Sequence, residues 1–142
     1  MTIAQILSRK SGELLSVSCD TPVRDAVAML AANRIGSLPV TRDGAVVGIM
    51  SERDIIYCLA SEGAAVLDWK VEKVMTSPAI TVTRDVAVLT ALSQMSRKRI
   101  RHLPVVDGDQ LIGIVSIGDL VAYRIEKIEQ EAEAMRAYIQ SA

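Results

Sequence analysis

The chain has 142 residues, half of them hydrophobic, and a formal net charge of −1. This length fits one domain or two small units that share a core. The near-neutral charge argues against a general nucleic-acid binder. The two cysteines and the single histidine cannot complete a usual zinc site, so we expect no metal. Without a membrane-length apolar stretch or a leader-like apolar start, a soluble cytoplasmic protein that binds no membrane is expected.

The sequence repeats itself at one constant offset, which aligns Val17 with Val82 and Asp54 with Asp119. From Val17 to Asp54, 13 of the 38 positions carry the same residue as their aligned partner. Average composition would give about two or three such matches by chance, so the repeat predicts two similar units. We predict one module over residues 1–142, with repeats at 11–62 and 74–123 and a helical extension over 124–142.

The first copy predicts the element order β-α-β-β-α. A short apolar strand over Leu14–Ser18 precedes a helix, for which Thr21 is the predicted N-cap and Pro22 the first helical residue. Two strands follow, over Ser37–Thr41 and Val46–Met50. Between them lies Asp43-Gly44, a strong hairpin signal. A second helix begins after residue 51.

The second copy repeats this order, with strands at Ala79–Thr83, His102–Val106 and Leu111–Val115. The connector over residues 61–74 lacks the composition of a flexible linker, so we expect it to be ordered. The predicted fold class is α+β. One unit of about 60 residues buries only a marginal core, so we expect the two units to pack through their sheets about a pseudo-two-fold axis.

A long C-terminal helix is predicted after Ser116, because this segment contains no proline and no glycine past position 118. Its apolar residues follow the 4-3-4-3-4 spacing of a coiled-coil seam: Val121, Ile125, Ile128, Ala132, Met135 and Ile139. Two interpretations are open. The seam packs on its own subunit, or it contacts a second copy of the chain.

Each copy also places Ser-x-x-Asp at the start of its second helix, as Ser51 with Asp54 and Ser116 with Asp119. One interpretation is a capping box, in which the serine and the acid satisfy the first helical amides. The other is a ligand site. A helix N-terminus attracts anions, a serine hydroxyl can contact a phosphate, and an aspartate can accept hydrogen bonds from the two hydroxyls of a ribose.

A basic run closes the first helix of the second copy. Arg97, Lys98 and Arg99 end this helix, where the helix dipole favours cations that are usually just solvated. Arg101 and His102 begin the next strand, and an arginine can hold a phosphate through two hydrogen bonds. A packed or surface histidine is the alternative for His102. Nucleic-acid binding by the run is disfavoured, because stacking aromatic residues are absent nearby.

The doubled pattern I-x-x-L-P-V, Asp-Gly, G-I-x-S-x-x-D resembles the tandem CBS module, also called the Bateman module, from about Ser11 to Tyr123. Modules of this kind commonly bind AMP, ADP, ATP, NAD or S-adenosylmethionine, regulate an effector protein and often form homodimers. The resemblance implies a regulatory adenosine-nucleotide-binding module that signals to an unknown partner. The alternative is a ligand-free interaction scaffold or dimerisation module. With no nucleophile–base pair, Walker loop or G-x-G-x-x-G, we expect no enzyme.

The resemblance also implies nucleotide-binding residues. By role these are Asp54 and Asp119 for ribose hydroxyls; Ser51 and Ser116 for the phosphate side; Thr76 and its partner Ser11 before the first strands; Ile80, Val82, Leu15 and Val17 as apolar walls for the base; and Arg101 and His102 for phosphate. In the first copy, Arg53 either partly substitutes for these basic residues or is simply an exposed residue of the first helical turn. The first copy has Gly36 and Ser37 where the second has Arg101 and His102. We therefore expect unequal clefts, the second being better equipped for phosphate.

Overall fold

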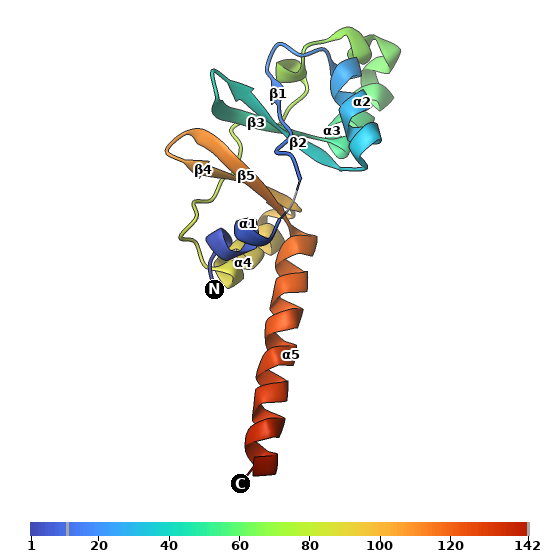
Figure 1. Ribbon diagram of the computed structural model, residues 1–142. Helices are drawn as coiled ribbons and strands as arrows, with labels where there is room; N and C mark the ends of the chain where they lie inside the picture. The colour runs from blue at the N-terminus through green and yellow to red at the C-terminus, as the bar shows by residue number, and fades with distance from the viewer. Residues whose placement is uncertain (11, 142) are drawn as a thin grey trace.

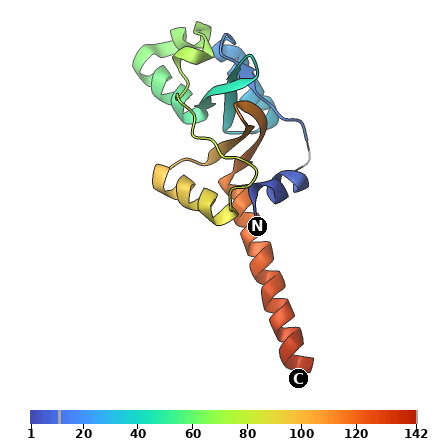
Figure 2. The ribbon, with the colours of Figure 1, turned by 90° about the vertical axis from the view of Figure 1, so that its left-hand side faces the viewer.

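The computed structural model describes residues 1–10 and 12–141 and shows two α+β units with a long helix extending away from them (Figures 1 and 2). Ser11, one of the expected site residues, lies outside the described residues. The elements in chain order are α1 (Ile3–Arg9), β1 (Val17–Ser18), α2 (Val23–Asn33), β2 (Ser37–Arg42), β3 (Ala45–Ser51), α3 (Glu52–Glu62), the 3-10 segments η1 (Gly63–Asp68) and η2 (Val71–Lys73), α4 (Val88–Lys98), β4 (His102–Asp107), β5 (Gln110–Ser116) and α5 (Ile117–Ser141).

The strands form one sheet in the order β1-β2-β3-β5-β4. The two units meet in its middle, where the antiparallel strands β3 and β5 pair at a single position. Two backbone hydrogen bonds flank this position: Val46 N–H donates to Asp109 O at 3.0 Å, and Leu111 N–H donates to Gly44 O at 3.4 Å. The repeat aligns Val46 with Leu111 and Gly44 with Asp109, so these two bonds are equivalent in the two copies. The expected pseudo-two-fold axis therefore passes between β3 and β5.

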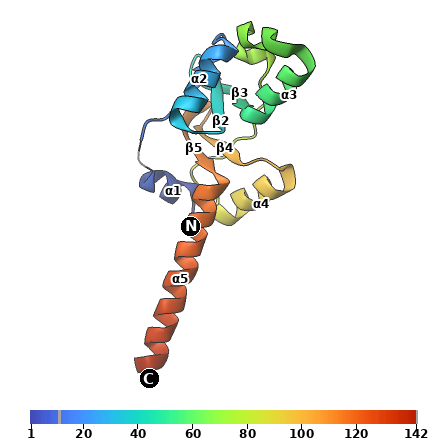
Figure 3. The same ribbon diagram turned by 90° about the vertical axis from the view of Figure 1, so that its right-hand side faces the viewer.

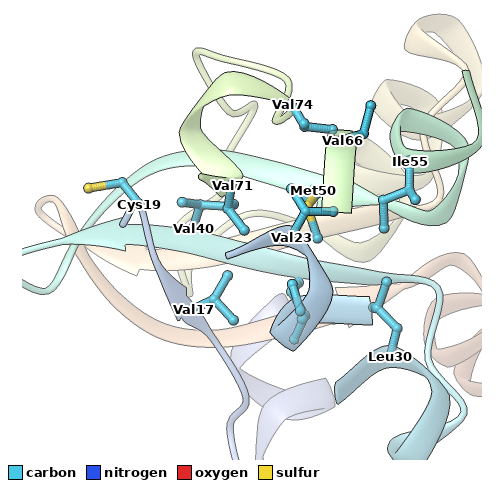
Figure 4. Close-up of a cluster of buried hydrophobic side chains, with 12 residues drawn as sticks. Val17, Cys19, Val23, Leu30, Val40, Met50, Ile55, Val66, Val71 and Val74 are labelled. Carbon is cyan, nitrogen blue, oxygen red and sulfur yellow. The ribbon is translucent and has the colours of Figure 1, made fainter. Parts of the chain in front are cut away.

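Each unit has its own hydrophobic core, and each core is completed by a segment that precedes the other repeat in the sequence. Helix α1 precedes the strands of the first repeat, yet Ile3 and Ile6 are buried in the cluster of the second unit. The connector precedes the strands of the second repeat, yet Val66 and Val71 are buried in the first unit (Figure 4). The connector is therefore ordered, and the exchange makes each core depend on both halves of the chain.

The first strand of each repeat is shorter than predicted. The strand predicted over Leu14–Ser18 is reduced to the two residues of β1, and that predicted over Ala79–Thr83 to one parallel bridge between Val82 and Val105. Both predictions rested on short apolar runs, which report burial but do not distinguish a strand from other buried backbone. These segments contribute apolar side chains to the cores with little strand pairing.

Helix α2 starts one residue later than predicted. Pro22 is its N-cap, in place of Thr21, and makes no side-chain capping bond. The Val23 amide instead donates to the carbonyl oxygen of Trp69 in the connector at 2.8 Å. Thr21 uses its backbone oxygen to accept from Val71 N–H, also at 2.8 Å. A contact with a segment distant in the sequence therefore satisfies the helix start, and a local capping rule could not predict it.

Candidate functional site

Both Ser-x-x-Asp motifs fold as capping boxes. At the start of α3, Ser51 N–H donates to Asp54 Oδ2 at 2.9 Å, and Asp54 N–H donates to Ser51 Oγ at 3.2 Å. At the start of α5, Ser116 N–H donates to Asp119 Oδ2 at 2.9 Å, and Asp119 N–H donates to Ser116 Oγ at 3.0 Å. The capping interpretation is therefore confirmed for both copies. A ligand role depends on what else surrounds each carboxylate.

Asp54 has a further partner from the second repeat. Thr76 Oγ1 donates to Asp54 Oδ1 at 3.1 Å, and the Thr76 backbone pairs with Ile49 through two hydrogen bonds of 2.9 and 3.0 Å. Asp54 is half-buried, whereas Thr76 is exposed. We call Ser51, Asp54 and Thr76 the Asp54 notch. The structure thus brings together three predicted site residues, two from the first repeat and one from the second, as a carboxylate flanked by two hydroxyls.

Asp119 is engaged differently, by a lysine that the sequence did not single out. Lys10 Nζ donates to Asp119 Oδ2 and to Ile114 O, both at 2.8 Å. The repeat offset pairs Ile114 with Ile49, whose carbonyl accepts from the Thr76 amide. The lysine ammonium therefore takes the place of that amide in the second copy. We call Lys10, Ser116 and Asp119 the Asp119 notch.

The Lys10–Asp119 pair keeps the carboxylate ionised. Burial raises the pKa of Asp119, but the hydrogen bonds from Lys10 and Ser116 outweigh burial, and the net pKa lies below the ordinary value of 3.8. The side chains of both partners are still about a third exposed. A ligand at Asp119 would have to displace the lysine from both the carboxylate and the Ile114 carbonyl.

Arg101 and His102 lie near the junction of the two units. His102 opens β4 and pairs with Ser116 of β5, and its ring also approaches the first unit, with Cε1 3.8 Å from where a Cβ on Gly36 would stand. Burial lowers the pKa of His102 below 6.5, although Asp119 and Glu52 attract the proton. The histidine is therefore neutral at pH 7. Arg101 is exposed to solvent.

The remaining predicted residues are spread between cores and surface. Val17 and Val82 are buried in the first and second hydrophobic clusters, respectively. Leu15 and Ile80 pack against those clusters but are only partly buried, so they are better placed than the two valines to offer an apolar surface to a base. Arg53 is exposed in the first turn of α3.

Ser37 is a second residue that the sequence did not assign to the site. It is buried, and its hydroxyl has no hydrogen-bond partner among the described residues. An unpaired buried hydroxyl costs about 1–3 kcal/mol. The repeat offset pairs Ser37 with His102, and this correspondence was the signal available in the sequence. Each unit thus places a polar side chain at the first residue of the strand that follows its first helix.

Cys19, Asp20 and Glu72 form a group of potential metal ligands within 4.8 Å of one another in the described part of the chain. Arg42 already occupies this group. Its Nε donates to Cys19 Sγ at 3.4 Å, and its Nη2 donates to Glu72 Oε2 at 2.9 Å. The guanidinium supplies the positive charge that an ion would bring, so we assign no metal to this cluster.

Gly48→Ala is expected to lower the free energy of unfolding by about 1–3 kcal/mol, the usual range for overpacking. An added Cβ would stand 2.8 Å from Thr76 O, a backbone atom held by Ile49. Gly113→Ala, the matched control, would meet only the flexible side chain of Leu7, at 2.6 Å, and should be milder. Urea denaturation measures both variants; equal losses would show that the Thr76 segment is not rigidly held.

Among residues 1–10 and 12–141, no helix is both long enough and apolar enough to cross a membrane. A model of the CBS domain family matches residues 3–61 and 71–126. Among curated proteins, the chain is similar to the mitochondrial CBS domain-containing protein CBSX3 of Arabidopsis thaliana. The two are 35% identical over 148 residues, which cover 98% of this chain and 72% of the relative.

Solved structures show the same architecture. The CBS-domain protein ATU1752 from Agrobacterium tumefaciens superposes with a TM-score of 0.81 at 34% identity, over 87% of this chain and 99% of that one. Protein PAE2072 from Pyrobaculum aerophilum, complexed with AMP, has a TM-score of 0.74 and 29% identity over 84% and 89% of the two chains. The CBS pair of protein MJ0100, complexed with 5-methylthioadenosine and S-adenosylmethionine, has a TM-score of 0.78 and 26% identity over 89% and 98%. The repeat, the fold and these matches together show that the chain belongs to the CBS-domain family, as a tandem CBS pair extended by a long C-terminal helix.

Proposed function

We propose that this CBS pair is a regulatory module that binds an adenosine nucleotide of the AMP, ADP, ATP or NAD type at the junction between its repeats. The observation that carries the proposal is the Asp54 notch, in which Asp54 contacts a hydroxyl from each repeat. PAE2072 binds AMP and MJ0100 binds S-adenosylmethionine. These ligands share adenosine and differ at the 5′ position, which supports a site that recognises the sugar and the base.

A ligand in this notch would act on the arrangement of the two repeats. Asp54 belongs to the first repeat and Thr76 to the second, so a ribose that hydrogen-bonds both would favour one relative position of the units. Signalling to a partner protein requires that the nucleotide bind the two arrangements with different affinity. The module would therefore regulate its partner without catalysing a reaction. A cytoplasmic location stays a prediction.

A ligand-free scaffold is the second candidate, and the Lys10–Asp119 pair favours it. In the Asp119 notch, an ammonium already contacts the carboxylate and the neighbouring carbonyl. If the Asp54 notch behaved in the same way, its motif would serve only as a helix cap. The two candidates differ in whether any adenosine compound stabilises the folded protein.

Thermal unfolding with AMP, ADP, ATP, NAD and S-adenosylmethionine tests the proposal, with GMP as the control for the base. A ligand present at 100 times its dissociation constant adds about 2.7 kcal/mol to the free energy of unfolding. At least one adenosine compound should raise the melting temperature, and GMP should give a smaller shift. No shift with any of the five compounds would favour the scaffold.

Lys10→Met is expected to open the second notch. Calorimetric titration should give about one nucleotide per wild-type chain and about two per variant chain, because the substitution frees Asp119 to accept from a ribose. Arg9→Met is the matched control, since Arg9 pairs with Glu126 instead. It should leave the stoichiometry unchanged. One nucleotide per Lys10→Met chain would mean that the lysine does not close the notch.

A further inference from the structure

Helix α5 presents an uncovered apolar seam. Of the residues over 117–141, Leu120 and Tyr123 are the ones buried. The large seam residues, by contrast, are between 42% and 65% exposed: Val121, Ile125, Ile128, Met135 and Ile139. Figure 3 shows α5 extending well beyond both units. The interpretation in which the seam packs on its own subunit is therefore wrong.

The seam also faces away from the subunit that carries it. In heptad notation, the 4-3-4-3-4 spacing places Val121 at d and Ile125 at a. Leu120 and Tyr123 then occupy c and f, on the back of the helix, and these are the residues that enter the core of the second unit. Arg9 contacts the same side of α5. Its guanidinium lies over the Tyr123 ring, 5.0 Å from the ring centroid, and pairs with Glu126. The a and d face is left free for a partner.

We propose that α5 pairs with α5 of a second copy as a parallel, in-register two-stranded coiled coil. The charged residues beside the seam indicate that the partner is a second copy of α5 and that the two helices run parallel. Arg124 and Glu131 are at g, and Glu129 and Arg136 are at e. In a parallel pair, each g residue faces the e residue five positions further along the other helix. Arg124 then meets Glu129 of the second copy, and Glu131 meets Arg136, so the flanking contacts are attractive.

An antiparallel pair does not fit the same sequence. When the whole seam over residues 121–139 overlaps in the antiparallel direction, e faces e and g faces g. Glu129 then opposes Glu129 of the second copy, and Glu131 opposes Glu131. Like charges at such positions are destabilising. The charge pattern therefore selects the parallel direction, which would place both CBS modules at the same end of the coiled coil.

Charge reversal tests the pairing. Light scattering should show a wild-type dimer, and Glu129→Arg should raise its dissociation constant about tenfold at low salt, because two attractive contacts per dimer become repulsive. The double variant Arg124→Glu with Glu129→Arg should restore dimerisation. Glu62→Arg, with the same charge change at an exposed position of α3, should change it by less than about threefold. A wild-type monomer, or a Glu129→Arg variant that dimerises normally, would overturn the proposal.

Cross-linking tests the direction. In a Cys58→Ser background, Met135→Cys places identical d positions opposite each other in the parallel pair, so mild oxidation should give a disulfide-linked dimer. Ala134→Cys, one residue away at c, should remain largely monomeric on a non-reducing gel. Equal cross-linking of both variants, or none with Met135→Cys, would overturn the parallel register. These outcomes do not depend on nucleotide binding, so they separate this proposal from the proposed function.

Discussion

Asp54→Ala is expected to abolish the thermal shift that adenosine nucleotides give the wild-type protein. At 100 times the wild-type dissociation constant, the variant should lose about 2.7 kcal/mol of ligand stabilisation. The reason is that Asp54 is the acceptor shared by Ser51 and Thr76, and it would accept from the ribose hydroxyls. The unliganded variant should also be about 1 kcal/mol less stable, because its capping box is broken. Thermal unfolding with and without nucleotide measures both effects.

Asp119→Ala is the matched control, because it breaks the equivalent capping box in the second unit. Its baseline stability should fall by a similar amount. Its nucleotide shift should persist, since Lys10 already occupies the Asp119 carboxylate in the wild type. If Asp119→Ala lost the shift and Asp54→Ala kept it, the ligand would bind in the second cleft, as the sequence had favoured. If both kept it, the motifs would be caps alone.

Ile6→Ala is expected to lower the free energy of unfolding by about 2–5 kcal/mol, as large-to-small substitutions in cores do. Ile6 lies in α1 at the start of the chain, yet it is buried in the core of the second unit, in the same cluster as Leu103 and Leu120. If α1 did not pack into this core, shortening the Ile6 side chain would change stability little. Urea denaturation followed by circular dichroism measures the loss.

The same experiment tests whether the exchanged segments couple the two units. Val71→Ala removes the residue at the equivalent position of the connector, which is buried in the first unit. Both variants should unfold in one transition shifted to lower urea, because each core contains a segment that precedes the other repeat in the sequence. Leu89→Ala, at an exposed position of α4, should change stability by less than about 0.5 kcal/mol. Two separate transitions in Ile6→Ala would show that the units fold independently.

Features whose signals are local could be predicted from the amino-acid sequence alone. The Asp-Gly hairpins, the two capping boxes and the start of α5 each depend on residues within a few positions of one another, where turn geometry and helix capping act. The repeat then related the two copies, and the heptad spacing of α5 defined its seam. These observations were sufficient for the α+β class, for two similar units and for the pairing of Ser51 with Asp54, whereas the tandem CBS architecture was implied by the resemblance of the doubled motif to that family.

The sequence did not predict which segment completes which core or what each aspartate contacts, and the folded chain was needed to show both. Ile6 packs into a unit whose strands all lie in the second half of the chain, and no periodicity in α1 indicates which of two similar cores it joins. Lys10 reaches Ile114 and Asp119 from the opposite end of the sequence, and an isolated lysine carries no pattern. Contacts of this kind depend on how the units close around the pseudo-two-fold axis, because burial and ion pairing are set by the final packing and not by neighbours in the chain.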